Sequence, residues 1–331
     1  MIFSLGENMY PLKFNPILKS MIWGGDKLRQ YKAITTDQKN IGESWGLSGV
    51  PGNESVVSNG EFAGRTITEL IKEYGAELLG RHVYETYGKN FPLLIKFIDA
   101  RDDLSIQVHP DDAMAQAVHG QPFGKTEMWY VVSADKDAHL MSGLSAKITP
   151  EEYVSRVENN TITDVLSDYK VQSGDVFFLP AGRIHSIGKG CFIAEIQQTS
   201  DLTYRIYDFG RLGLDGKPRE LHTELAKDAI DFSVSDDYRT EYKRVMNEDT
   251  TLVECEYFKT HYFDLTQPVS VGVKSKDSFM IVICLRGKGE LLDSNGNFVA
   301  LRQGETVLVP ASVVDVLFVP ANSLELLICW V

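Results

Sequence analysis

The sequence predicts a mainly β protein that contains two β-barrel domains, with a few helices inserted in its N-terminal half. Most of the 331 residues fall into short β-rich or alternating segments separated by Gly, Pro, Asn and Asp, a pattern typical of sandwiches and barrels. Residues 171–181 and 301–311 also share one order of glycine, acid, four mostly apolar residues, proline and alanine. This internal similarity predicts two copies of one barrel unit, in which the glycine opens a turn and the proline ends an apolar strand.

Three helices are expected between the strands. Residues 66–80 begin with a capping box and carry apolar residues at helical spacing. The pair Thr149–Pro150 is a second start signal, and a third helix is expected over 223–230. The polar stretch 233–250 has little periodicity, so we expect the connection between two domains, 1–235 and 236–331, to lie there.

Composition limits the partners. The formal net charge of −13 and the isoelectric point near 5.0 argue against nucleic acid and anionic membranes as partners. A small anionic substrate stays possible because basic residues gather between residues 96 and 211. The four cysteines have no C-x-x-C spacing, which favours buried thiols. No signal peptide is expected in residues 1–20, and no apolar run approaches a membrane span, so the expected location is cytoplasmic.

Two strand-like segments carry the most informative polar side chains. Side chains alternate between the faces of a strand, so Ser105, Gln107 and His109 share one face, and Lys125 and Glu127 point the same way in the second segment. Nitrogen and oxygen ligands of this kind suit zinc, manganese or iron. Burying the lysine and glutamate together without a metal or an anion would be costly. Taken alone, His109 is equally a strand-end histidine, and Gln107 is either a ligand or a neighbour that orients one.

A third polar group follows the first copy of the internal repeat. His185 stands five residues after Pro180, at the end of a Gly-x5-Pro-x-Gly-x2-His turn. Five residues after Pro310, the second copy has Asp315 instead. The sequence therefore predicts a metal site inside the first barrel and a second barrel that has lost it.

Three further residues have both a structural and a functional interpretation. Arg205 either pairs with Asp208 at the surface or presents its guanidinium to phosphate or to charge building on an enediolate oxygen. Glu195 is either a general base or a structural carboxylate. Trp23 lies beside a glycine pair, where a core aromatic is the default interpretation.

These motifs resemble a known family. The turn 174–185 resembles the second cupin motif, although Lys189 stands where that motif often has Asn. Segments 105–110, 124–130 and 200–205 together look like type I phosphomannose isomerases, in the short bacterial form. The resemblance covers roughly residues 10 to 230, and the C-terminal repeat fits the family's second cupin domain.

The resemblance implies two cupin (jelly-roll) barrels, with a catalytic domain at 1–235 and a degenerate domain at 236–331 that has no metal site. It implies an isomerase with one zinc ion per chain that interconverts mannose 6-phosphate and fructose 6-phosphate through a cis-enediol. Carried over residue by residue, Gln107, His109, Glu127 and His185 would hold the metal, Arg205 would be the active-site arginine, and Ser105 and Lys125 would line the substrate pocket. Apart from the resemblance, we expect Lys125 and Glu195 as further catalytic residues and Trp23 as a further substrate-binding residue.

Two alternatives remain. His109, Glu127 and His185 also form a two-histidine, one-carboxylate set that suits an iron-dependent cupin oxygenase, although a fourth ligand at Gln107 argues against it. The other is a cupin that binds sugar phosphates without catalysis. The expected partner of the isomerase is a small sugar phosphate, and the expected assembly is a monomer or a homodimer.

Overall fold

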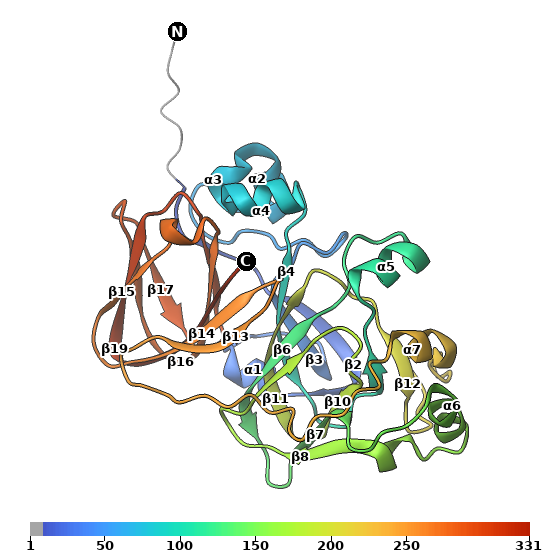
Figure 1. Cartoon of the computed structure of the whole chain (residues 1–331). Helices are drawn as coiled ribbons and strands as arrows, with labels where there is room; N and C mark the ends of the chain where they lie inside the picture. Colours follow the sequence, from blue (N-terminus) through green and yellow to red (C-terminus); the bar gives the residue numbers. More distant parts are fainter. Residues whose placement is uncertain (1–8) are drawn as a thin grey trace. The chain divides into compact units, whose positions relative to one another are not determined.

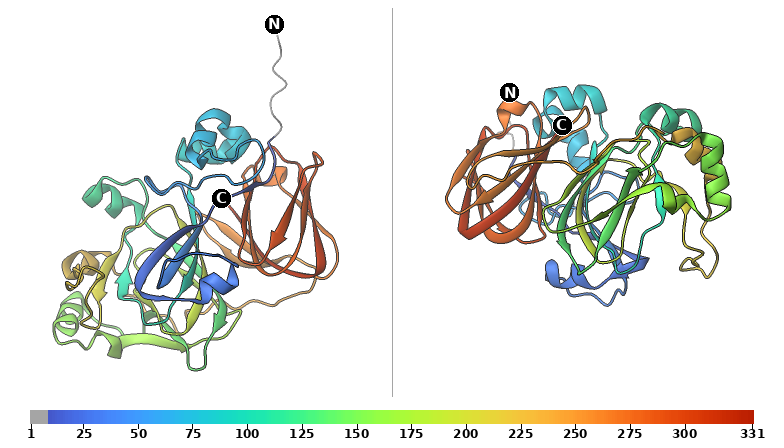
Figure 2. Two further views of the ribbon diagram at one scale, coloured as in Figure 1. Left: turned by 180° about the vertical axis from the view of Figure 1, so that it is seen from behind. Right: turned by 60° about the horizontal axis from the view of Figure 1, so that its bottom comes forward.

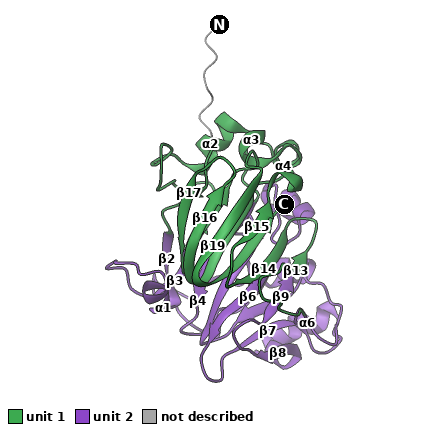
Figure 3. Ribbon diagram, turned by 90° about the vertical axis from the view of Figure 1, so that its left-hand side faces the viewer, with its two compact units in different colours: residues 1–16, 46–92, 242–331 green, residues 17–45, 93–241 purple. Residues whose placement is uncertain are grey.

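A computed structural model describes residues 9–331, and the predicted mainly β architecture is confirmed. Backbone contacts divide the chain into two compact units, each assembled from separated segments (Figure 3). Within the described residues, unit 1 comprises 9–16, 46–92 and 242–331, and unit 2 comprises 17–45 and 93–241. The last passage between the units, at 241/242, falls in the polar stretch expected to be a connection. Unit 1 contains residues from both sides of the predicted domain boundary at 235/236, because residues 46–92 pack within it. That boundary stays a prediction.

Unit 2 contains two β-sheets that enclose a common interior. The six-stranded sheet has the order β2 (Ile17–Gly25), β3 (Ile41–Leu47), β4 (Leu93–Asp99), β11 (Cys191–Gln198), β6 (Glu127–Ala134) and β9 (Val176–Leu179). The five-stranded sheet has the order β12 (Tyr204–Tyr207), β5 (Ile106–Val108), β10 (His185–Ile187), β7 (His139–Leu144) and β8 (Leu166–Lys170). One apolar cluster joins them, with Trp129 and Ile193 from the larger sheet and Leu140 and Ile187 from the smaller one. The cluster fills one part of the interior.

The smaller sheet has two different faces. Its outer face is apolar, where Ile106 and Tyr204 pack in one cluster with Tyr153 of α6 (Pro150–Glu158) and Ala226 of α7 (Thr223–Ala229). Both helices lie beside this sheet in Figure 1. Residues directly opposite each other on neighbouring strands share a face. Polar residues opposite one another on β12, β5, β10 and β7 therefore face inward, in the order Arg205, Gln107, His185 and Ser142.

The three predicted helix starts are confirmed with one change of length. The Thr66 capping box is present, and Thr149 caps α6. The first helix is divided at Gly75, whose φ of 47° ends α2 (Ile67–Tyr74) before α3 (Ala76–Leu79). Helices α1 (Lys27–Tyr31), α4 (Arg81–Tyr87) and α5 (Asp112–His119) were not predicted, because short helices carry little periodic pattern. Two 3₁₀ turns cover Ile162–Val165 and Lys274–Lys276. Helices α2, α3 and α4 form one group in every view (Figures 1 and 2).

Unit 1 contains one antiparallel eight-stranded sheet wrapped around an apolar core (Figure 3). Its main path is β1 (Leu12–Lys13), β18 (Thr306–Val309), β16 (Met280–Asp293), β19 (Asp315–Trp330), β14 (Lys259–Leu265) and β13 (Thr250–Glu254), with β15 (Val269–Gly272) on β19 and β17 (Phe298–Arg302) on β16. The core cluster contains Met280, Val282 and Ile328.

The internal repeat is confirmed by matching backbone hydrogen bonds. In unit 2, the Gly174 N–H donates to the Val131 carbonyl at 2.8 Å, and in unit 1 the Gly304 N–H donates to the Cys284 carbonyl at 2.8 Å. Both glycines have positive φ, 95° and 82°, which a residue with a side chain rarely adopts. Strands β9 and β18 follow the two turns at the same spacing.

The cysteine prediction is confirmed for three residues. Cys191, Cys284 and Cys329 are buried free thiols, and Cys255 is a free thiol that is partly buried. In residues 9–331 no helix is both long and apolar enough to span a membrane. The segment in which no signal peptide was expected lies partly outside the described residues, because it includes residues 1–8.

Candidate metal centre

Three predicted ligands meet in the interior of unit 2. His109, Glu127 and His185 are all buried, and one ligand atom of each lies within 4.8 Å of the others. Glu127 Oε1 is 3.4 Å from His185 Nε2, and Glu127 Oε2 is 3.7 Å from His109 Nε2. Glu127 is the first residue of β6 and His185 the first of β10, whereas His109 directly follows β5. The two sheets therefore supply opposite sides of one group that could hold a metal ion.

Hydrogen bonds fix which nitrogen of each histidine faces the centre. His109 Nδ1 lies 2.8 Å from the Leu202 carbonyl, and His185 Nδ1 lies 2.7 Å from the Arg183 carbonyl. Because a carbonyl only accepts, each Nδ1 carries the hydrogen and each Nε2 keeps its lone pair for the centre. Burial, together with the charge of Lys125, lowers the pKa of His185 to about 3 and the pKa of His109 well below its ordinary value. Both rings are thus neutral, as metal ligands must be.

Glu127 completes a donor set that lacks a partner. Its Oε1 is buried and has no hydrogen-bond donor among the described residues. Burial and the nearby charge of Glu195 raise the pKa of Glu127, against the opposing effect of Lys125. A fully buried carboxylate oxygen without a partner is costly. A divalent cation bound by this carboxylate and two imidazoles would remove that cost, so the chemistry of the donor set fits a metal such as zinc.

Lys125 places its ammonium beside the same atoms. Its Nζ lies 2.9 Å from His109 Nε2 and donates to Glu127 Oε2. The backbone brings it there by a close approach, because a Cβ on Gly124 would lie 2.4 Å from the Asp111 carbonyl carbon. Lys125 and Glu127, which were predicted to lie side by side, are therefore in direct contact. The candidate ligand atoms of His109 and Glu127 already face one positive charge, that of the Lys125 ammonium.

Gln107 borders the cluster from β5, and Ser105 precedes that strand. Gln107 Nε2 lies 3.4 Å from His185 Nε2, and Ser105 is buried immediately before the strand. Sequence reasoning missed Ser142, which lies opposite His185 on β7 and whose buried Oγ has no hydrogen-bond partner among the described residues. The short sequence Met-Ser-Gly carries no pattern that distinguishes this serine.

Arg205 faces the interior without a carboxylate partner among the described residues. Its Nη1 donates to the Glu220 carbonyl at 3.0 Å, and its Nε is buried without a partner. The alternative pairing with Asp208 is wrong, because Asp208 instead binds Arg211, at 2.7 Å, and Arg219. Burial and the charge of Arg219 lower the pKa of Arg205. Its guanidinium thus forms no ion pair with an acidic side chain of the described residues, although the charges of Asp208 and Glu220 partly offset the fall in its pKa.

Glu195 is engaged by two neighbours on the larger sheet. Lys96 Nζ lies 3.1 Å from Glu195 Oε1, and the Trp129 indole N–H donates to Glu195 Oε2 at 2.9 Å. Burial alone would raise the pKa of Glu195, but the charges of Lys96 and Lys125 lower it to about 2. The edge of Trp129 packs on the His185 ring, with centroids 5.2 Å apart. Sequence reasoning missed Lys96, although one lysine inside the otherwise apolar run LLIKFI was a usable signal.

Trp23 lies in the apolar part of the interior. Only 4% of it is exposed, and it packs in the cluster that contains Trp129 and Leu140. This is the core position that its sequence context allowed. Its part in substrate binding stays a prediction.

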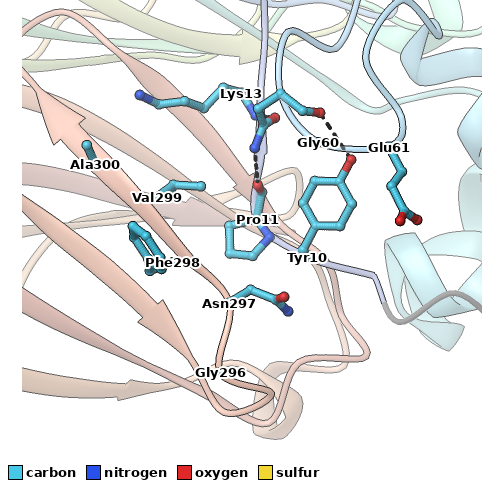
Figure 4. A pocket seen from close by; sticks show the side chains of 11 residues that line it. Tyr10, Pro11, Lys13, Gly60, Glu61, Gly296, Asn297, Phe298, Val299 and Ala300 are labelled. Carbon is cyan, nitrogen blue, oxygen red and sulfur yellow. Dashed lines mark hydrogen bonds between the residues drawn. The ribbon is translucent and has the colours of Figure 1, made fainter.

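A separate pocket of about 880 Å³ lies in unit 1 (Figure 4). Its polar groups largely satisfy one another: Asn59 Oδ1 accepts from the Lys13 backbone N–H at 2.7 Å, and Tyr10 donates to the Asn59 carbonyl at 3.1 Å. The lining contains no histidine or cysteine, and Glu61 is its sole carboxylate. This pocket therefore lacks a set of metal ligands, unlike the interior of unit 2.

Comparisons with known proteins agree with the arrangement. The model described as phosphomannose isomerase type I, catalytic domain, matches residues 12–139, and that described as mannose-6-phosphate isomerase, cupin domain, matches residues 248–318. Mannose-6-phosphate isomerase ManA of Bacillus subtilis is 36% identical over 91% of this chain and 93% of its own length. The Streptococcus mutans mannose-6-phosphate isomerase is 35% identical over 92% and 93%. A crystal structure of the Bacillus subtilis mannose 6-phosphate isomerase has a TM-score of 0.87, at 31% identity over 98% of this chain and 100% of that one.

Proposed function

The chain belongs to the type I phosphomannose isomerase family, and we propose that it interconverts mannose 6-phosphate and fructose 6-phosphate at the buried cluster of unit 2. The observation that carries the proposal is the meeting of His109, Glu127 and His185 in the interior of a chain that matches full-length isomerases. The reaction moves a proton between C1 and C2 of the sugar through a cis-enediol. It therefore needs groups that bind the sugar oxygens, balance negative charge and exchange protons.

One zinc ion per chain is the proposed cofactor, held by His109, Glu127, His185 and Gln107. The two Nε2 lone pairs and the unpaired Glu127 oxygen supply three of the four positions of a zinc site. The Gln107 amide would offer its oxygen after a half-turn about its last bond, which exchanges the oxygen and nitrogen positions. When bound, zinc supplies Lewis-acid polarisation of the sugar oxygens.

Lys125 and Arg205 are the proposed catalytic residues at the substrate. Lys125 Nζ lies beside His109 Nε2 and donates to Glu127 Oε2. With the His109 Nε2 lone pair on the metal, the ammonium would have hydrogens free to donate to, and exchange a proton with, a substrate oxygen. Arg205 faces the interior and forms no ion pair among the described residues. Its planar guanidinium suits the negative charge that builds on the enediolate oxygens. Ser105 and the unpaired Ser142 hydroxyl would complete the lining for sugar hydroxyls.

Glu195 is a poor candidate for the general base that moves the proton between C1 and C2. Both of its oxygens already contact Lys96 or Trp129, and a carboxylate with a pKa of about 2 is a poor proton acceptor near neutral pH. The contacts support a role in holding Trp129 against His185.

The cytoplasm is the proposed location, since free thiols persist in reducing compartments. A small sugar phosphate is the proposed partner, with no nucleic acid or membrane. Whether the protein is a monomer or a homodimer stays a prediction.

A coupled assay of mannose 6-phosphate conversion tests the function. Purified protein is measured as prepared, after chelation and after zinc, manganese or iron(II) is returned. Turnover that is lost on chelation and restored by zinc is the expected result. No turnover in any metal state would favour a sugar-phosphate-binding cupin. Turnover that survives complete metal removal would show that the ligand assignment is wrong.

A further inference from the structure

The residue before α7 breaks the usual rule for helix starts. His222 occupies the N-cap of α7, a position where Ser, Thr, Asp or Asn normally accepts a hydrogen bond from the first turn. Its side chain makes no such cap. Instead, His222 Nδ1 accepts a hydrogen bond from the Arg205 backbone N–H at 3.1 Å. The ring therefore forms its hydrogen bond with strand β12 and does not cap its own helix.

A second bond makes this contact a two-point attachment. The His222 backbone N–H donates to the Arg205 carbonyl at 2.7 Å, so both backbone polar groups of Arg205 are held by one residue. Two residues earlier, the Glu220 carbonyl accepts from Arg205 Nη1 at 3.0 Å. The segment from Glu220 to His222 thus holds the backbone and the side chain of Arg205 together. Strand β12 is the edge of its sheet, so no further strand supplies these bonds.

Asp208 closes the loop that leads to this segment. It lies just after β12, is buried, and binds both Arg211 and Arg219. The arginine fork makes two bonds with the carboxylate in the case of Arg219. This one carboxylate thus shares its negative charge between Arg211 and Arg219 and forms no ion pair with Arg205. The bond between Asp208 and Arg219 also brings the chain back to β12, where residues 220–222 contact Arg205.

We propose that His222 is a positioning residue for the isomerase reaction, and that its Nδ1 acceptor holds Arg205 so that the guanidinium meets the substrate's negative charge. The inference rests on the role of Arg205 under the proposed function. Burial lowers the pKa of His222 against the opposing charge of Glu220, and the charge of Arg205 adds to the lowering. A lowered pKa favours the neutral ring that an Nδ1 acceptor requires. The simpler alternative is that His222 merely covers a sheet edge, which contributes to stability only.

Three substitutions separate these roles. In H222N the amide oxygen lies near the position of Nδ1 and keeps the acceptor, in H222Q the amide lies farther out, and in H222L no acceptor remains. We expect kcat to fall about 10-fold or more in H222L and H222Q, since a small displacement of a catalytic group costs up to about 10²-fold. H222N should stay within about 3-fold of the parent, and zinc content should not change in any of them.

The controls use Arg205 itself and a histidine elsewhere. In an R205A background, H222L should cause no additional loss, because a residue that acts only through Arg205 has nothing left to position. H139L is the matched control, since His139 is also a partly exposed histidine bound through Nδ1, to Asp168 at 2.7 Å. Its kcat should equal that of the parent.

The outcomes distinguish the inference from its premise. Parental kcat in H222L, or equal losses in H222N, H222Q and H222L, would overturn the positioning role of the Nδ1 acceptor. If R205A itself keeps parental kcat, the proposed role of Arg205 fails first. An impaired R205A together with an unimpaired H222L would remove only the inference about His222.

Discussion

The two units contain the same turn and strand, yet only one has a polar interior. In unit 2, Glu127 on β6 lies opposite Leu179 on β9. In unit 1, Met280 on β16 lies opposite Val309 on β18, at the same place in the repeat. Glutamate has thus been replaced by a methionine that belongs to the apolar core. The turn and strand therefore specify the barrel, whereas single inward-facing residues specify the site.

The position that matches His185 differs in orientation as well as in identity. His185 is buried and faces inward, opposite Gln107 on β5. Asp315 lies opposite Gly272 on β15 and is exposed, while the next residue, Val316, is in the core. Because side chains alternate along a strand, Asp315 points away from the interior of unit 1. One carboxylate in the second copy therefore does not indicate a remaining metal site.

The strand next to the site shows the same contrast. On β11, Glu195 lies opposite Trp129 and Lys96, so unit 2 carries a buried ion pair. In unit 1, Ile328 lies opposite Val282 on the neighbouring strand, and both belong to the apolar core. The unit 1 barrel thus forms around an apolar core, and buried ion pairs are often no more stable than apolar replacements. The ion pair of unit 2 is therefore consistent with a role in the functional site rather than in the stability of the barrel.

Removal of a ligand from unit 2 should have the largest effect. We expect H185A to lose bound zinc and about 10³-fold or more in kcat, since a metal supplies several kcal/mol of charge stabilisation. Replacement of Met280 in unit 1 by leucine should change neither quantity. Zinc content by elemental analysis and kcat on the same preparations test the contrast. Zinc retained by H185A would show that His185, the first residue of β10, is not a metal ligand.

The second largest effect is expected at the buried Lys96–Glu195 ion pair, as a loss of folding stability. E195Q leaves Lys96 buried without its closest counter-charge, since Glu43 is 4.0 Å away. A loss of about 3–5 kcal/mol is typical when one partner of a buried pair is removed. The double variant K96M/E195L, which imitates the apolar arrangement of unit 1, should recover most of that stability but not the activity. Denaturant unfolding measures the first effect and the coupled assay the second. Unchanged stability in E195Q would contradict the contrast between the two interiors.

Asp208 provides a prediction about pH. Burial by itself would raise the pKa of Asp208, but hydrogen bonds from Arg219 and Arg211 lower it. A carboxyl group whose pKa is lower in the folded state stabilises the fold above its unfolded pKa, about 3.9, and loses this contribution as the pH falls through its folded pKa. D208N should therefore be less stable than the parent at pH 7, by on the order of 1–3 kcal/mol. The difference should shrink below about pH 4. Unfolding curves at pH 7, 5 and 3 test this; a pH-independent difference would assign the loss to packing.

Changes at Asp315 should have the smallest effect. D315A is expected to keep the zinc content and kcat of the parent, because the side chain is exposed and points away from the core of unit 1. D315H, which restores the histidine of the first copy, should gain no second zinc equivalent for the same reason. Elemental analysis against the parent decides both cases. Loss of a metal equivalent in D315A would show that the second barrel holds a site after all.

Local sequence patterns were sufficient for much of the fold and for the main ligands. The repeated glycine and proline positions predicted the two barrels because turn geometry and strand ends depend on a few neighbouring residues. Strand alternation placed Gln107 and His109 on one face, and the short distance between Lys125 and Glu127 predicted their contact. The helix at 66–80 was predicted as one element, but a left-handed turn at Gly75 divides it.

Contacts between distant segments were decided only by the tertiary structure. Sequence spacing could not show that Asp208 binds Arg211 and Arg219 rather than Arg205. Nor could it show that Lys96 and Glu195 pair across two strands. The orientation of the strand that begins at Asp315 depends on the residues it meets in the core. Composition and alternation are local properties that the chain carries into any fold, whereas the partner of a buried charge is set by strand register, which exists only once the sheets have formed.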